Sequence, residues 1–231
     1  VAHAGVLWIP MVIDGEARPV AGVHAVCTAA THRGRGLARK VIDAAVEHAL
    51  EHAETVLLHA NEPAIYGRFG FRPLAQTVWW CEPSVPRAAA MRRLSSDDPA
   101  DVARVWAAFR GRVPVSQTLG VGEADALFVL DEVLACKRFA RLWAMDDLVI
   151  AADYEDRELR IYDVVGPRWP ELDELVAHAP GRVDRVEIFF GPDRWATTRW
   201  KAREMEAPDV LMVKGPFTRA SAIAIPPMSR C

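Results

Sequence analysis

Residues 19–52 change from a strand pattern to a helical pattern across a short turn that contains two glycines. Residues 19–28 (PVAGVHAVCT) are rich in valine and small apolar residues, which favours a strand. From Leu37 onward the apolar residues recur at helical spacing, which predicts a helix over residues 34–52. Strands and helices that alternate along one chain predict an α/β or α+β fold.

Further strands and helices are expected on both sides of this unit. A strand at 4–13 precedes it across a hairpin or short loop at 14–18, and residues 55–60 form an apolar run that predicts a buried strand. Pro63 suits a first helical position and predicts a short helix at 63–68. The remaining expected elements are strands at 71–81, 91–94, 138–145, 147–154, 158–165, 184–190 and 209–214, and helices at 97–109, within 112–137 and at 168–178.

The length of the chain, 231 residues, suits two domains, since domains cluster near ~100 to 150 residues. Pro83, Pro86 and three consecutive alanines interrupt the periodic pattern. We therefore expect a first domain at 1–83, a linker at 84–90 and a second domain at 91–231.

Charge and cysteine content exclude several classes of function. The chain holds 28 basic and 31 acidic residues, a net charge of -3 that gives no field for nucleic acid or an anionic membrane. No apolar run approaches the ~18 residues that span a bilayer. The four cysteines are far apart without a C-x-x-C pair, which gives no support for a metal site or a disulfide framework and favours the reducing cytoplasm.

The turn at residues 31–40 (THRGRGLARK) carries the pattern of an anion site. Backbone N–H groups in the first turn of a helix lack helical partners and attract anions, and Arg33, Arg35 and Arg39 add positive charge. A Walker A loop is excluded because no Gly-Lys-Ser/Thr follows, and a dinucleotide fingerprint would need glycine where Arg39 stands. The other interpretation is a tight connection with solvated arginines.

Two segments together resemble the GCN5-related N-acetyltransferases (GNAT superfamily). Arg33-x-x-Gly36-x-Ala38, between a strand and an amphipathic helix, is similar to the coenzyme A signature of that family, and residues 61–71 (NEPAIYGRFGF) are similar to its later tyrosine-bearing segment. The combination is especially similar to Eis-like enzymes, in which a GNAT domain precedes a second, degenerate GNAT-like domain. The resemblance covers residues 4–82 at the level of motifs, and it implies a mixed central sheet flanked by helices.

The resemblance implies acetyl-CoA as cofactor and assigns residues to it. Backbone groups of residues 26–28 would pair with the pantetheine arm, and residues 34–39 would hold the pyrophosphate. Tyr66 would be the general acid, with a packed aromatic as the alternative. The implied cofactor-binding residues are Val26, Cys27, Thr28, Arg33, Gly34, Arg35, Gly36, Leu37, Ala38, Arg39, Asn61 and Glu62.

One assignment in this region stays open, and another depends only on the residue type. The general base that would deprotonate the acceptor amine is open among Glu62, His59, His24 and the C-terminal carboxylate of Cys231. Cys27 is expected to be a small buried residue rather than a nucleophile.

The implied activity is acetyl transfer from acetyl-CoA to a primary amine on a small molecule or peptide, and a homo-oligomer is compatible with it. The alternative is a non-catalytic coenzyme A-binding or interaction protein. The first strand and first two helices of a complete GNAT domain have no counterpart before Val1, so the first domain is expected to lack them.

The second half of the chain is expected not to bind coenzyme A. At 163–170 it reads DVVGPRWP, where two prolines remove the amide donors that an anion needs. Its tryptophans are either core and interface residues or an aromatic substrate pocket. They are Trp106, Trp143, Trp169, Trp195 and Trp200.

Overall fold

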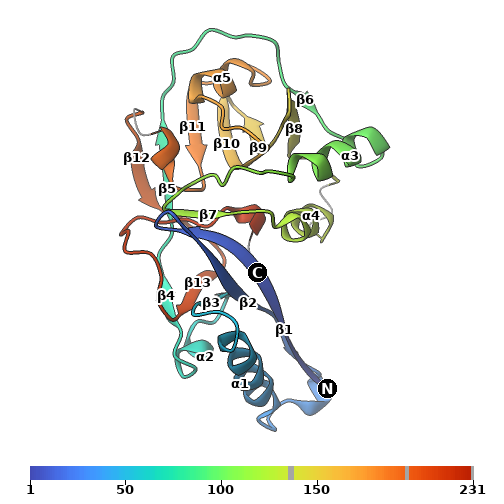
Figure 1. Cartoon of the computed structure of the whole chain (residues 1–231), viewed down its shortest axis with the longest axis vertical. Coiled ribbons are helices and arrows are strands. Elements are labelled where there is room, and N and C mark those ends of the chain that lie inside the picture. Colours follow the sequence, from blue (N-terminus) through green and yellow to red (C-terminus); the bar gives the residue numbers. More distant parts are fainter. Residues whose placement is uncertain (135–137, 196–197, 230–231) are drawn as a thin grey trace.

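The computed structural model describes residues 1–134, 138–195 and 198–229, and the strands in them form two sheets. In spatial order, sheet A contains β4 (Arg72–Leu74), β13 (Val210–Lys214), β3 (Val56–Ala60), β2 (Glu16–Thr28), β1 (Ala2–Ile13) and β7 (Leu119–Val121). Sheet B contains β12 (Lys201–Glu204), β5 (Thr77–Cys81), β11 (Arg185–Ile188), β10 (Glu158–Val165), β9 (Leu148–Glu155), β8 (Leu142–Met145) and β6 (Arg92–Arg93). Sheet A occupies the lower half of the molecule in Figure 1 and sheet B the upper half.

Both sheets mix parallel and antiparallel pairs, and the helices flank them. In sheet A, β2 is antiparallel to β1 and parallel to β3; in sheet B, β10 is antiparallel to β9 and parallel to β11. The helices are α1 (Leu37–Leu50), α2 (Ala64–Gly67), α3 (Pro99–Ala108), α4 (Asp125–Leu134) and α5 (Leu172–Ala177). The predicted mixed α/β fold is confirmed, with strands more prominent than helices.

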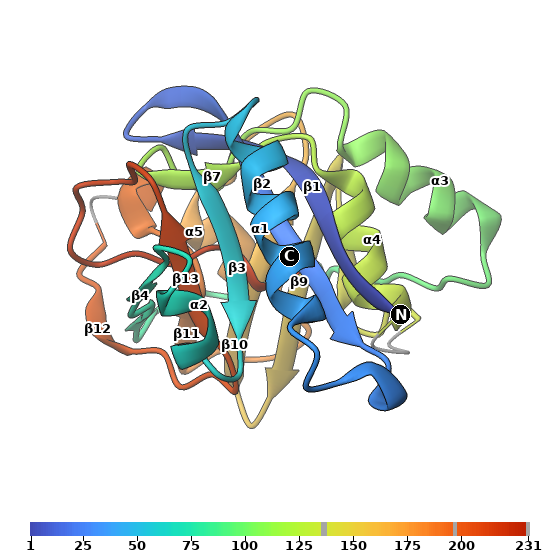
Figure 2. The same cartoon turned by 90° about the horizontal axis from the view of Figure 1, so that it is seen from below.

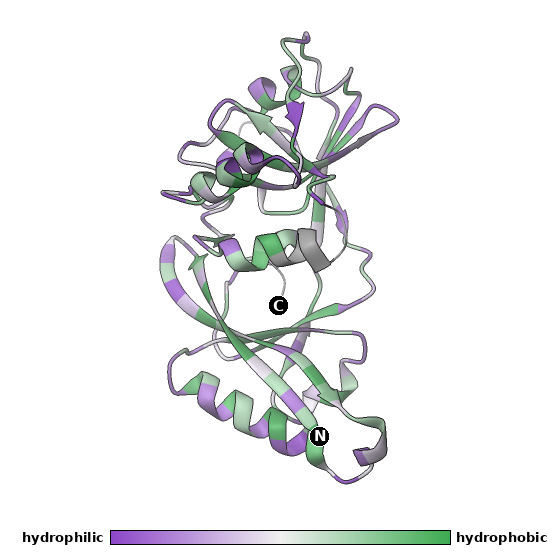
Figure 3. Ribbon diagram, turned by 90° about the vertical axis from the view of Figure 1, so that its right-hand side faces the viewer, coloured by the Kyte–Doolittle hydropathy of each residue, from purple (hydrophilic) through white to green (hydrophobic). Residues whose placement is uncertain are grey.

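Sheet A is covered on both faces, which explains why four consecutive residues of β2, Val20 to Val23, are buried. Ile42 and Val46 of α1 pack on one face against Val23 and Leu58. Figure 2 shows α1 lying along the sheet. The opposite face contributes a second apolar cluster, which includes residues of β7, α4 and the segment 223–225. The hydropathy colouring of Figure 3 shows apolar residues along the strands between these layers.

Sheet B is likewise packed on two faces. Leu172 and Leu175 of α5 pack with Leu159 and Val186, and α3 packs on the other face. The start of α3 is as predicted, because Pro99 stands in its first turn and the Asp98 side chain accepts a hydrogen bond from the Ala100 N–H at 2.9 Å.

The two sheets exchange strands across the expected boundary between residues 83 and 91. Strand β5, before that boundary, lies between β11 and β12 of sheet B. Strands β13 and β7, after it, complete sheet A by pairing with β3 and β1. Residues 82–91 do lack regular structure, and in Figure 1 they pass over the top of sheet B. The division of the chain into sheets therefore differs from its expected division along the sequence.

The expectation of one strand over 71–81 is wrong. The segment forms β4 and β5, which belong to different sheets, and the chain bends between them at Ala75 and Gln76. Gln76 fixes the bend, since it is buried and its Oε1 accepts a hydrogen bond from the Ile225 N–H at 3.0 Å. The short strands β7 and β12 were not predicted from the sequence.

Two buried features mark the second half of the chain. Trp143 and Trp195 lie in the core of sheet B, with Trp169 and Trp200 packed against it, which favours the core interpretation for these four. Trp106 is exposed, so the core interpretation does not apply to it. Arg112 and Asp163 form a wholly buried ion pair at 2.6 Å. No helix in the described parts of the chain has the length and apolar character needed to cross a membrane.

Candidate functional site

A cleft opens in sheet A where β2 and β3 separate. These strands are paired only at Ala21 with Val56 and Gly22 with Leu57. Beyond that point they diverge, and a cleft of 330 Å³ lies between them. Its walls are residues 23–26 of β2, residues 59–62 at and just after the end of β3, and Ile65 and Tyr66 of α2.

A bulge in β2 turns the backbone at this cleft. The pairing with β1 shifts between His3–Cys27 and Gly5–His24, so that Ala25 and Val26 stand opposite a single residue. Ala25 has a φ of 51°, in the left-handed region, and its carbonyl contacts the His3 Nδ1 at 3.1 Å. Bulges of this kind end regular pairing and redirect the strand. Beyond Gly22, the edge of β2 that faces β3 has no strand partner among the described residues, so the backbone groups on that edge are available to a ligand.

A second hollow, of 320 Å³, lies at the start of α1. It is lined by Thr28 at the end of β2, by residues 32–34 and 36–39, and by Arg68 after α2. Gly34 and Gly36 have φ values of 75° and 71°, and a Cβ at either position would meet no atom within 4 Å. The loop therefore turns through two left-handed glycines and leaves the space above them open.

The N-terminus of α1 has no cap. The residue before the helix is Gly36, and no side chain accepts a hydrogen bond from the first turn. Within the described residues, none of the backbone N–H groups of residues 34–39 donates a hydrogen bond to a protein group. Six successive amides without protein partners, at the positive end of a helix of 14 residues, form an anion-binding surface.

Arginines surround these amides. The Arg33 Nε donates to the Thr28 carbonyl at 3.3 Å, and the Arg35 Nη2 donates to the Thr31 carbonyl at 3.1 Å. The first bond ties the loop to the end of β2, and the second ties it to the 3-10 turn at Ala30–His32. Arg39 lies 3.6 Å from Asp43 one turn along α1. Arg68 lines the same hollow but was not assigned to it from the sequence; its place beside Tyr66 was the available signal.

Tyr66 lies on the cleft wall in a partly apolar setting. It is half-buried, and its ring packs edge-on against Phe71 with centroids 6.3 Å apart. Burial raises the pKa of the Tyr66 phenol further above its usual value, which already leaves a phenol protonated at neutral pH. A protonated phenol can donate a hydrogen bond or a proton into the cleft.

The structure brings most of the predicted site residues to the cleft or the hollow. Val26, Asn61, Glu62 and Tyr66 line the cleft. Thr28, Arg33, Gly34, Gly36, Leu37, Ala38 and Arg39 line the hollow. Arg35 and Cys27 line neither, although Arg35 belongs to the loop and Cys27 to β2 between Val26 and Thr28.

The expectation that Cys27 is buried is wrong. Cys27 is a free, exposed cysteine near the end of β2, past the point where β2 stops pairing with β3. Of the candidate bases, Glu62, His59 and His24 all line the same cleft as Tyr66. Cys231 lies outside the described residues.

Comparison with known proteins relates the sequence of this site to acetyltransferases. Residues 1–74 match the family model described as "Acetyltransferase (GNAT) domain". Two Streptomyces griseus proteins, named "Uncharacterized N-acetyltransferase" and "Uncharacterized N-acetyltransferase ORF5", are each 39% identical over 95 residues. That alignment covers 41% of this chain and 22% of either relative, so the similarity extends over about a fifth of those proteins.

Solved structures agree in fold over most of the chain. Eis1 from Mycobacterium abscessus superposes with a TM-score of 0.58 at 15% identity, covering 93% of this chain and 61% of that one. A GCN5-related N-acetyltransferase from Kribbella flavida gives a TM-score of 0.52 at 15% identity, covering 92% and 56%. The likeness shows the predicted GNAT fold, and this chain spans about three fifths of those proteins.

Proposed function

Residues 1–74 carry the acetyltransferase domain of the GNAT family, and from this premise we propose that the chain is an N-acetyltransferase which moves an acetyl group from acetyl-CoA to a primary amine. The observation that carries the proposal is the row of six unpartnered amides at residues 34–39, found on the same β2–α1 unit whose strand also lines the cleft with Tyr66. An anion at the amides and a thioester near the tyrosine match the two ends of one long cofactor.

The residues at the start of α1 fit a pyrophosphate. The left-handed glycines leave room for phosphate oxygens above the loop, since a Cβ at Gly34 or Gly36 would point into open space. Hydrogen bonds from amides to a charged oxygen are worth about 1.5–3 kcal/mol each. Arg33, Arg39 and Arg68 add positive charge around the hollow.

The open edge of β2 fits the extended arm of the cofactor. Backbone N–H and C=O groups of residues 26–28 have no strand partner on the side of the cleft, and pantetheine carries amide groups that pair with a strand edge. Acetyl-CoA, when bound, supplies an acetyl group activated as a thioester. The identity of the side chains at 26–28 matters little, since the backbone does the binding.

In this proposal Tyr66 supplies the proton for the departing thiolate. Its phenol is protonated at neutral pH, and it lines the same cleft as Val26 of the open strand edge. The amine must arrive without its own extra proton, because an alkylammonium has no lone pair with which to attack. Glu62, His24 and His59 are the candidate bases on the cleft walls, and the proposal does not choose among them.

The acceptor is proposed only as a small-molecule or peptide amine. The cytoplasm is kept as the proposed compartment on the cysteine content of the sequence.

Titration calorimetry with acetyl-CoA and with coenzyme A tests the binding step. An acetyl-transfer assay over a panel of amines then tests catalysis. Tyr66→Phe should lower turnover by about ten- to several-hundredfold while acetyl-CoA still binds, in the range of general acid catalysis. Tyr154→Phe is the matched control, because Tyr154 lies in sheet B and its hydroxyl donates to the Arg182 carbonyl at 2.8 Å.

Each result has a distinct meaning. If neither cofactor binds below millimolar concentration, the proposed function is wrong. Binding without transfer to any amine indicates a non-catalytic coenzyme A-binding protein. Equal turnover in Tyr66→Phe and Tyr154→Phe removes Tyr66 from the mechanism.

A further inference from the structure

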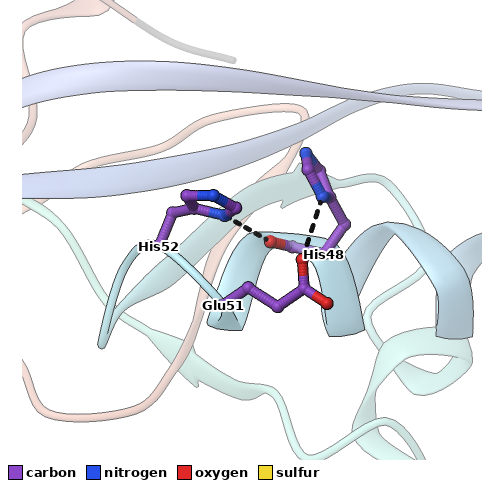
Figure 4. A group of neighbouring side chains, drawn as sticks. All are labelled: His48, Glu51 and His52. Carbon is purple, nitrogen blue, oxygen red and sulfur yellow. Dashed lines mark hydrogen bonds and ion pairs between the residues drawn. The ribbon is translucent and has the colours of Figure 1, made fainter.

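Three side chains that can bind a metal ion lie together at the C-terminal end of α1. They are His48, Glu51 and His52, and each offers one donor atom within 4.8 Å of the others (Figure 4). The helical turn continues through all three, since the His52 N–H donates to the Ala49 carbonyl at 3.2 Å. Two histidines that are four residues apart lie on the same face of a helix, and this spacing is used to bind zinc.

The hydrogen bonds of the cluster favour metal binding. The His52 Nδ1 lies 3.3 Å from the His48 carbonyl, a contact that suits a protonated Nδ1 and leaves the Nε2 lone pair for a ligand. The His48 Nδ1 lies 3.4 Å from the Glu51 Oε2, so the carboxylate and an imidazole already meet. All three side chains are exposed, so a metal ion can reach them from solvent.

Trp8 of β1 holds both imidazoles in place. Its ring contacts His48 and His52 edge-on, with centroid distances of 5.9 and 5.5 Å, and the two imidazole centroids are 5.3 Å apart. Aromatic contacts limit the rotamers of both histidines, which lowers the entropy lost on binding. The negative end of the α1 dipole also lies here and favours a cation.

We propose that His48, Glu51 and His52 form a binding site for a divalent transition-metal ion of the zinc class. Two imidazole nitrogens and one carboxylate oxygen suit Zn²⁺, whereas Ca²⁺ and Mg²⁺ prefer oxygen ligands alone. With bonds of about 2.0–2.1 Å, donor atoms of a tetrahedral site lie about 3.4 Å apart. The side chains must therefore turn inward so that their donor atoms come closer by about 1 Å. Water would complete the coordination.

The site is separate from the proposed acetyl-CoA surface. The two lie at opposite ends of α1, a helix of 14 residues, and a helix of that length spans about 20 Å. Bound metal would join two turns of α1 beside Trp8 of β1. Bound metal is therefore expected to stabilise the contact between α1 and β1, and not to change the residues that line the cleft.

Titration calorimetry with ZnCl₂ tests the site on protein without a histidine tag, in slightly alkaline buffer because imidazole must be neutral to bind metal. One Zn²⁺ per chain is expected, together with a higher melting temperature. His48→Gln and His52→Gln should each weaken binding at least tenfold. His178→Gln is the matched control, because His178 lies beside α5 in the other half of the molecule and its Nδ1 contacts the Glu174 carbonyl at 2.7 Å.

Circular dichroism without metal confirms that each variant is folded, since these side chains are exposed. The proposal is overturned if wild-type protein takes up no Zn²⁺, or if His48→Gln and His52→Gln bind it as tightly as His178→Gln. Neither result bears on acetyl-CoA binding, which is measured separately.

Discussion

Replacing Gly36 by alanine tests two roles of the loop separately: the free energy needed to hold its backbone conformation, and its binding of the cofactor. Gly36 has a φ of 71°, and a Cβ there would meet no atom within 4 Å. The cost to stability thus comes from the backbone alone, about 1–2 kcal/mol for an L-residue held in the left-handed region. For a chain of this size each kcal/mol lowers the melting temperature by about 2–4 °C.

Gly15 offers a control with the same backbone strain. It lies in the turn between β1 and β2, has a φ of 84°, and likewise has no atom within 4 Å of a built Cβ. Gly15→Ala should therefore lower the melting temperature by a similar amount. The two substituted positions differ in location, because Gly36 lies among the unpartnered amides at the N-terminus of α1 and Gly15 does not.

Acetyl-CoA affinity should distinguish the two variants. A methyl group at position 36 would point into the space where phosphate oxygens are proposed to lie, and the loss of one charge-assisted hydrogen bond is worth about 1.5–3 kcal/mol. Calorimetry should show about tenfold to 150-fold weaker binding in Gly36→Ala, since 1.4 kcal/mol is a factor of ten. Gly15→Ala should bind like the wild type.

Two results would refute this reasoning. Equal acetyl-CoA affinity in both variants would mean that the amides at the start of α1 do not hold the cofactor. Gly36→Ala with an unchanged melting temperature would mean that the loop does not need a left-handed residue at this position.

Three further predictions concern the rest of the chain. Arg112→Met leaves a wholly buried carboxylate without its cation and should lower the free energy of unfolding in urea by about 3–5 kcal/mol. Hydrogen bonds from Arg92 lower the pKa of Asp101 to about 2, so the extra stability of wild type over Asp101→Asn should be constant above about pH 4 and shrink as the pH falls toward 2 in acid titrations. Iodoacetamide followed by peptide mass analysis should label exposed Cys27 well before Cys81, whose pKa burial raises to about 11.

Local pattern predicted the elements that form the candidate site. The β1–β2 pair, α1, β3 and α2 all occur where the sequence placed them, within a few residues at their ends. Each has its own periodicity and its own turn residues, such as Gly36 before α1 and Pro63 before α2. Residues 26–28 and 34–39 follow one another along a single strand, loop and helix. Their neighbourhood can therefore be predicted from the order of residues in the sequence.

The local sequence pattern did not predict which distant segments pair with each other. Residues 71–81 read as one continuous strand-forming run, so nothing in the sequence separates β4 in sheet A from β5 in sheet B. Strand β12 reads Lys-Ala-Arg-Glu and is exposed throughout, and charged residues do not favour a strand by themselves. It is a strand because β5 supplies its partner.

The separation of β2 and β3 at the cleft was also not predicted. Both strands read as ordinary apolar runs, and only the bulge at Ala25 and the short ladder between them reveal where pairing stops. The gathering of His24, His59 and Glu62 on one cleft follows from that divergence.

The place of β13 between β3 and β4 has a consequence for how the protein is made. A ribosome would release the strands of the candidate site long before residues 210–214, so one edge of β3 would lack a hydrogen-bonding neighbour until that segment is made. Such an edge can pair with a neighbouring chain. Because the closing contact joins segments far apart in sequence, it is also expected to form late. The candidate site thus becomes rigid only after residues 210–214 have been made, and its maturation depends on a segment far downstream of its own strands.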